Sequence, residues 1–129
     1  TPQRVADITR RFGMPVMKVI KVASSDDIQV AAAYVDTATM IMFDAKAPET
    51  LADALPGGNG LTFDWDLLGG NGANREFMLG GGLNAQNVAA AIAASGAPIV
   101  DVSSGVEVQP GKKDCGLIRN FIEAARAAG

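Results

Sequence analysis

Histidine is absent from this 129-residue sequence, and that absence excludes several kinds of active site. A Ser-His-Asp triad, a histidine general base and a histidine-ligated zinc site cannot come from this chain. Acid and base chemistry would have to use carboxylates, lysines, the single tyrosine or the single cysteine. Because Cys115 has no second cysteine to pair with, an internal disulfide is also excluded.

Strong charge of one sign and long apolar runs are missing as well. Eleven basic residues stand against 14 acidic ones, and no basic cluster is larger than a pair. This balance disfavours nucleic acid and anionic membrane surfaces as partners. No apolar run is long enough to span a bilayer, and no charged-then-apolar leader is seen, so we expect a cytoplasmic protein.

Hydrophobic residues are plentiful, at 48% of the sequence. A chain of this length and composition can bury one core, and nothing in it indicates a second domain or a disordered tail. We therefore treat residues 1–129 as a single unit, and we expect no metal and no cofactor.

Segments typical of strands and helices alternate along the chain. A helical pattern opens at Thr1-Pro2 and ends at Gly13, with Val5, Ile8 and Phe12 predicted on its buried face. Four strand-like runs follow, each leading to a helical pattern: Val16–Val22, Thr39–Asp44, Phe77–Leu79 and Pro98–Val102. This order predicts an α/β fold with a parallel sheet and right-handed crossovers.

The helix boundaries carry their own signals. Ser24 and Asp27 have the spacing of a capping pair, and Asn84 is a good N-cap for which Asn87 forms only a partial capping box. The last helix is predicted to begin near Asp114. Its predicted buried face consists of Ile118, Phe121, Ile122 and Ala125.

The long connection at 45–62 contains proline and glycine turns and is typical of a functional lid or a disordered segment. A short helix is predicted around 63–68, where Phe63 and Trp65 are interpreted as packing anchors. A glycine-rich stretch at 69–73 then leads into the third strand.

Chemically useful residues follow the predicted strands. In parallel α/β sheets, ligands bind at the carboxyl ends of the strands. That rule places Asp44, Gly80–Gly82, Asp101 and Ser103–Gly105 at one edge, although they are scattered in sequence. Glycines admit a ligand close to the backbone, and serine hydroxyls with backbone N–H groups suit an anion. The pattern predicts a phosphate site, against the alternative of two plain turns.

Several individual roles stay open at this stage. Asp44 could be a general acid or a cap for the loop that follows it. Asp101 could polarise a ligand amine or hydroxyl, or satisfy donors within its turn. Lys18 could face the site or solvent, and Cys115 could be a reactive thiol or a small apolar filler.

A dinucleotide site is another interpretation, because residues 80–85 fit the pattern G-x-G-x-x-A and Asp101 follows at a suitable distance. That motif normally opens a Rossmann sheet, whereas two strand-helix units precede it here. A second phosphate loop at Ser103–Gly105 favours a mononucleotide or a sugar phosphate instead.

Four motifs in register resemble the phosphoribosylanthranilate isomerase family over essentially the whole chain. They are Met42–Pro48; Gly57–Gly60 with Phe63–Trp65; Leu79–Asn84 with Asn87-Val88; and Val100–Glu107 with Pro110–Asp114. The resemblance implies an aldose-ketose isomerase of tryptophan biosynthesis that acts on a phosphorylated sugar-anthranilate substrate. It implies the parallel (β/α)₄ second half of a TIM (β/α)₈ barrel, from helix 4 through strand 8 and helix 8.

By this resemblance, Asp44 matches the family's general acid, and Asp101 matches its carboxylate near the anthranilate amine. The phosphate loops are matched by Gly81, Gly82, Ser103, Ser104 and Gly105. The family's cysteine base, in a Cys-Gly-Ile type motif, and its anthranilate-binding arginine belong to the first half, and Cys115 is not in that place. The implied fragment is inactive alone, and its two open sheet edges would pair with an N-terminal half or with a second copy. The alternative is an independent phosphate-binding or assembly module.

Overall fold

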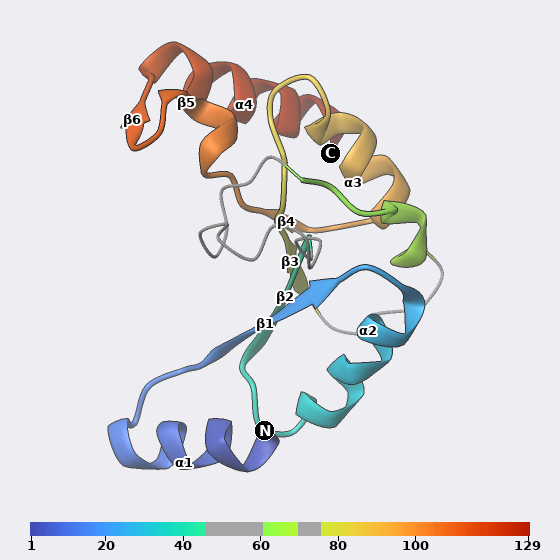
Figure 1. Cartoon of the computed structure of the whole chain (residues 1–129), viewed down its shortest axis with the longest axis vertical. Coiled ribbons are helices and arrows are strands. Elements are labelled where there is room, and N and C mark those ends of the chain that lie inside the picture. Colours follow the sequence, from blue (N-terminus) through green and yellow to red (C-terminus); the bar gives the residue numbers. More distant parts are fainter. Residues whose placement is uncertain (46–60, 70–75) are drawn as a thin grey trace.

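The computed structural model describes residues 1–45, 61–69 and 76–129. Its centre is a parallel sheet of four strands in the order β1-β2-β3-β4 (Figure 1). The strands are β1 (Met17–Val22), β2 (Met40–Ala45), β3 (Phe77–Leu79) and β4 (Ile99–Val100). The helices are α1 (Pro2–Phe12), α2 (Ser25–Gln29), α3 (Val88–Ser95) and α4 (Cys115–Ala128). The predicted α/β class and the parallel pairing are confirmed.

Shorter elements complete the described part of the chain. Three 3₁₀ helices are η1 (Val30–Tyr34), η3 (Trp65–Leu67) and η4 (Ser104–Val106). A small antiparallel hairpin joins β5 (Glu107–Gln109) to β6 (Lys112–Lys113). The predicted lid lies mostly at 46–60, and most of the glycine-rich stretch lies at 70–75, both outside the described residues.

The first helix has the predicted ends but not the predicted buried face. The Thr1 side chain accepts a hydrogen bond from the Arg4 backbone N–H, and Gly13 ends the helix at a φ of 63°. Val5 is buried with Tyr34 and Ala38, but 63% of Phe12 is exposed. α1 lies at one end of the molecule (Figure 1), and the Arg11 guanidinium lies 5.5 Å from the centre of the Phe12 ring.

The capping box predicted after β1 is present. The Asp27 carboxylate accepts hydrogen bonds from the backbone N–H groups of Ala23 and Ser24, at 2.9 and 3.1 Å. The α-helix it starts is brief, and the chain continues as the 3₁₀ helix η1. Such tightening is common where α-helices end.

The helix after β3 begins one turn later than predicted. Asn84 Oδ1 accepts from the Asn87 N–H at 3.1 Å, while Asn87 Oδ1 accepts from the Asn84 N–H at 2.8 Å. This reciprocal pair closes a turn, and Asn87, rather than Asn84, is the N-cap of α3. The Asn87 side-chain N–H also donates to the Gly82 carbonyl at 2.9 Å, which ties the helix start to the glycine turn.

The end of the chain differs from the prediction in two ways. β4 covers only Ile99–Val100 of the predicted run, because the backbone turns from the sheet toward η4. The β5–β6 hairpin was not predicted at all. Its sequence signal is Pro110-Gly111, a turn pair whose glycine has a φ of 79°.

The main core lies between the sheet and the helices α2, α3 and α4. Leu79, Val22 and Val88 are less than 2% exposed, and the rings of Phe43 and Phe77 meet edge to face with centroids 5.6 Å apart. The interpretation of Phe63 and Trp65 as packing anchors is confirmed, since both pack against this core.

The buried face of α4 is rotated from the predicted one. Phe121 is buried and Ala125 packs against the core, as expected, but Ile118 and Ile122 are 37% and 43% exposed. Leu117 and Ala124 take their places against the core. The buried positions still follow helical spacing, so the helix was predicted correctly but its buried face was not.

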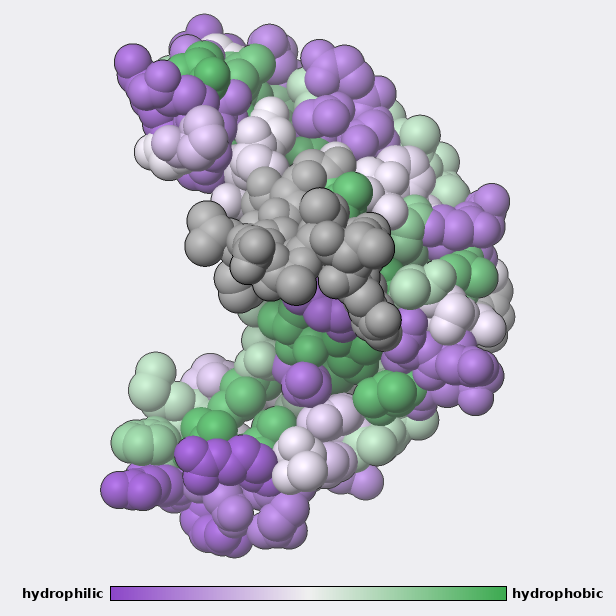
Figure 2. All heavy atoms as spheres, in the orientation of Figure 1, coloured by the Kyte–Doolittle hydropathy of each residue, from purple (hydrophilic) through white to green (hydrophobic). Residues whose placement is uncertain are grey.

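The sheet ends at β1 on one side and β4 on the other, and within the described ranges each of these strands pairs on one side only. The molecule is a crescent with the strands at its middle (Figure 1), and Figure 2 shows hydrophobic residues gathered over that middle. None of the helices described is long and apolar enough to cross a membrane.

Two strand valines test whether this core stabilises the chain. Val22→Ala should lower the free energy of unfolding by about 2 kcal/mol, since it removes two buried methyl groups and leaves a cavity. Val108→Ala, the same change at a residue that is 58% exposed, should stay within about 0.5 kcal/mol. Urea unfolding of both variants measures this, and equal effects at the two positions would contradict the described core.

Candidate functional site

The register of the sheet brings the predicted residues to one edge. Phe43 stands opposite Leu79, and Leu79 stands opposite Val100. The ladder continues for one bond past each strand, because Gly80 N–H donates to the Phe43 carbonyl and Asp101 N–H donates to the Leu79 carbonyl, both at 2.8 Å. The residues after β3 and β4 therefore leave the sheet side by side, next to the end of β2.

The glycine turn after β3 lies between the two predicted carboxylates. A Cβ atom added to Gly81 would lie 2.6 Å from Asp44 Oδ1, and one added to Gly80 would lie 3.6 Å from Asp101 Oδ2. Gly81 also has a φ of 91°, which an L side chain rarely adopts. The turn therefore needs glycine at position 81, beside Asp44, whereas a side chain at position 80 would be in ordinary van der Waals contact with Asp101.

The same turn contacts the loop that follows β4. A Cβ atom on Gly105 would overlap the Leu83 carbonyl, with the carbonyl carbon only 2.9 Å away. Gly82 has a φ of 65°, and a Cβ atom added to it would lie 2.4 Å from the Leu61 carbonyl oxygen. The two predicted phosphate loops, Gly80–Gly82 and Ser103–Gly105, are thus neighbours in space, as the sequence predicted. Ser104 begins η4 within the second loop.

Asp44 has a charged partner that sequence reasoning missed. Lys21 stands opposite Asp44 in the β1–β2 register, and its ammonium forms an ion pair with Asp44 Oδ2. The Asp44 side chain is only 15% exposed, against 41% for Lys21. The parallel pairing of two strand ends was the available signal. Lys18, the lysine considered instead, lies 5.3 Å from the centre of the Tyr34 ring.

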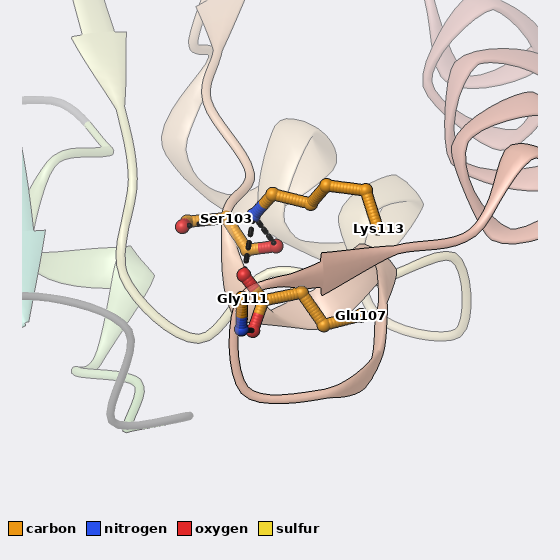
Figure 3. A network of polar contacts seen from close by, with 4 residues as sticks. All are labelled: Ser103, Glu107, Gly111 and Lys113. Atoms are coloured by element: carbon orange, nitrogen blue, oxygen red, sulfur yellow. Dashed lines mark hydrogen bonds and ion pairs between the residues drawn. The ribbon is translucent and has the colours of Figure 1, made fainter.

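Ser103 is held by a polar network from the hairpin (Figure 3). Lys113 Nζ donates to the Ser103 carbonyl at 2.8 Å, to Ser103 Oγ at 3.2 Å and to Glu107 Oε1 at 2.6 Å. Gly111 N–H donates to the other Glu107 oxygen at 3.2 Å. The hydrogen bond from Lys113 and the one from Gly111 lower the pKa of Glu107 below its usual value. Nothing in the sequence pattern alone had connected Lys113 with Ser103.

Chemically, the edge combines two carboxylates with the predicted phosphate loops. Asp44 can exchange a proton, Asp101 is exposed and free to meet a ligand amine, and the glycine turn and serine loop are suited to a phosphate group between them. Cys115 is exposed at the first position of α4, outside this cluster. No group of three or more metal-ligating acids and cysteines occurs among residues 1–45, 61–69 and 76–129.

The structure also weakens the dinucleotide interpretation. The strand order β1-β2-β3-β4 follows the sequence without the reversal at which a Rossmann sheet binds its ligand. α3 begins only at Val88, so its N-terminus is separated from the glycine turn by the Asn84–Asn87 turn.

Comparisons with known proteins identify the family of this chain. The family profile described as N-(5'phosphoribosyl)anthranilate (PRA) isomerase matches residues 3–124. A relative of that name from Parvibaculum lavamentivorans is 52% identical over 99% of this chain, which spans 60% of the relative's length. The phosphoribosylanthranilate isomerase structure from Thermotoga maritima has 34% identity and a TM-score of 0.78, covering 98% of this chain and 56% of that one.

A further solved structure carries a ligand. It is a phosphoribosyl anthranilate isomerase in complex with reduced 1-(o-carboxyphenylamino)-1-deoxyribulose 5-phosphate, with 28% identity and a TM-score of 0.71 over 98% of this chain and 66% of that one. The extent of the family match and the identity to the Parvibaculum relative decide the assignment. The chain belongs to the N-(5'-phosphoribosyl)anthranilate isomerase family.

Proposed function

We propose that this chain supplies the proton-donating and phosphate-binding part of a phosphoribosylanthranilate isomerase of tryptophan biosynthesis. The observation that carries the proposal is the contact of Gly80-Gly81 with both Asp44 and Asp101 at one sheet edge, in a chain of this family. The ligand held by the related structure, a sugar phosphate linked to an anthranilate-type ring, supports a substrate of the same class here.

The reaction moves protons without net loss or gain of electrons. Asp44, as general acid, protonates the ring oxygen of the furanose while the bond from that oxygen to C1′ breaks and the anthranilate nitrogen forms a Schiff base with C1′. A base then removes the C2′ proton, and the C2′–H electron pair forms the enamine that becomes the keto product. Asp44 carries its proton before this step, and the ion pair with Lys21 holds the carboxylate that remains after the proton is given.

The phosphate group is assigned to the two adjacent loops. Gly81 and Gly82 offer backbone that no side chain shields, and Ser103–Gly105 adds hydroxyl and backbone donors beside them. With the phosphate at these loops, the anthranilate end of the substrate extends toward Asp101. The carboxylate of Asp101 then accepts a hydrogen bond from the anthranilate amine.

The architecture supports the assignment of this chain to half of a barrel. Four parallel strands with one-sided pairing at β1 and β4 correspond to the (β/α)₄ second half of a TIM barrel, from helix 4 to helix 8. Such edges would be completed by an N-terminal half or by a second copy of this chain. The resemblance to the family implies a cysteine base in the first half of the barrel, and Cys115, at the start of α4, is not in that place. We therefore expect the base to come from that partner and the chain alone to be inactive.

Complementation tests both the half-barrel and the acid. The chain alone should show no loss of substrate fluorescence, whereas a mixture with the amino-terminal segment of the Parvibaculum relative should be active. Asp44→Asn should lower kcat of the mixture by about 10²–10⁴-fold, because the amide cannot donate the catalytic proton. Asp36→Asn, the same change at an exposed aspartate outside the site, is the matched control and should leave kcat unchanged.

Three results would contradict parts of this proposal. Turnover by the chain alone would disprove the claim that its base lies elsewhere. Full activity of Asp44→Asn would remove Asp44 as the acid. Inactivity of a mixture whose pieces are folded and associated would disprove the half-barrel assignment, and phosphate binding alone would then be the better function.

Alanine substitutions at two glycines with positive φ distinguish steric contact with Asp44 from backbone strain as the reason why the turn needs glycine. Gly81→Ala places a methyl group against Asp44 and Ala45 and should lower activity of the mixture at least about tenfold. Gly96→Ala has a similar φ of 69° but meets nothing within 4 Å, so it should cost about 1–2 kcal/mol of stability and leave activity intact. Comparable losses of activity in both variants would show that strain, not contact with Asp44, limits the turn.

A further inference from the structure

The side chain of Ser103 is held in a way that its position in the fold does not require. Ser103 precedes η4, but its hydroxyl makes no capping hydrogen bond to that helix. Instead, both Ser103 oxygens accept from one ammonium group, Lys113 Nζ, at 2.8 Å for the carbonyl and 3.2 Å for Oγ (Figure 3). A residue ten positions later in the chain therefore decides where this hydroxyl lies.

The direction of the hydroxyl proton follows from the chemistry of the pair. A lysine ammonium only donates, and a serine hydroxyl has one proton and two acceptor lone pairs. Ser103 Oγ must therefore be the acceptor in its contact with Lys113, so its own proton points elsewhere. Ser103 is exposed at the edge that carries the glycine turn. Its proton is thus available to an acceptor that arrives there, such as a phosphate oxygen.

Lys113 itself is fixed by the hairpin. An ammonium group has three N–H bonds, and the two Ser103 oxygens and Glu107 Oε1 account for three contacts. Glu107 is held in turn by the Gly111 N–H at the hairpin turn. With its pKa lowered by these two donors, Glu107 is ionised at neutral pH and balances the charge of Lys113. The Lys113–Glu107 pair therefore adds no net positive charge beside Ser103, and its effect on Ser103 is to fix the position of the side chain.

We propose that Lys113 is a positioning residue for phosphate recognition: it orients the Ser103 hydroxyl so that its proton donates to a phosphate oxygen bound between the two loops. The inference deepens the proposed function and rests on its phosphate site. It assigns to the β5–β6 hairpin, which lies outside the strand-helix repeat, a task in substrate binding.

Binding of inorganic phosphate to the full chain, measured by calorimetric titration, tests the proposal. Lys113→Met keeps the alkyl stem but removes the donors, and should weaken phosphate binding by about tenfold. Lys112→Met, the same change at the adjacent exposed lysine outside the network, should stay within about twofold. Lys113→Arg retains donors and should recover part of the affinity.

A double-mutant cycle shows whether Lys113 acts through Ser103. In a Ser103→Ala background, the effect of Lys113→Met on phosphate affinity should shrink to less than about threefold, because the hydroxyl it orients is gone. Far-UV circular dichroism and urea unfolding report folding of each variant. The tight fit of Gly105 against Leu83 should keep the loop in place without Lys113.

The outcomes separate the two levels of inference. If the unmodified chain fails to bind inorganic phosphate, the proposed phosphate site is wrong and this inference falls with it. If the unmodified chain binds phosphate and Lys113→Met binds equally well, only the role of Lys113 is overturned. A stability loss without an affinity change would reduce Lys113 to a structural contact. An undiminished effect in the Ser103→Ala background would show that Lys113 acts on phosphate without Ser103, which also overturns the proposed role.

Discussion

Close backbone approach at the carboxyl edge of the sheet is the constraint on which the site depends. Gly81 lies where a methyl group would meet Asp44, and Gly105 lies where one would overlap the Leu83 carbonyl. Because neither contact leaves room for a side chain, the end of β2 and the loops after β3 and β4 are held in a fixed order along the edge. The carboxylates and the two loops proposed to bind phosphate reach one place through backbone packing.

The hydrophobic core and a few polar contacts both fix the positions of the residues at that edge. Leu79, fully buried, fixes the strand from which the glycine turn leaves, while Asn87 ties the same turn to α3 through the Gly82 carbonyl. Lys21 holds Asp44 on one flank, and Lys113 holds Ser103 on the other. The strands thus fix the positions of these residues, and the two lysines orient the polar side chains at the edge, which is where ligands bind in parallel α/β folds.

Much of this could be predicted from local sequence. The strand runs, the Gly13 helix end and the Ser24–Asp27 capping box all rest on neighbouring residues, and the structure has each of them. The rule that ligands meet strand ends also gathered Asp44, Gly81 and Asp101 correctly. What failed depended on tertiary packing: α4 turns Leu117 inward instead of Ile118, and α3 starts at Val88 because Asn84 and Asn87 cap each other. The contact between Lys113 and Ser103 could not be predicted, because it depends on the β5–β6 hairpin rather than on the spacing of residues in the sequence.

We propose that a phosphorylated substrate is held between the Gly80–Gly82 turn and the Ser103–Gly105 loop. The most direct measurement is a crystal structure of the chain, joined by its complementing partner, with the reduced carboxyphenylamino-deoxyribulose phosphate bound. We expect the phosphate group to lie between these two loops and the sugar to be directed toward Asp44. Density for the phosphate at any other place on the chain, with these loops empty, would contradict it.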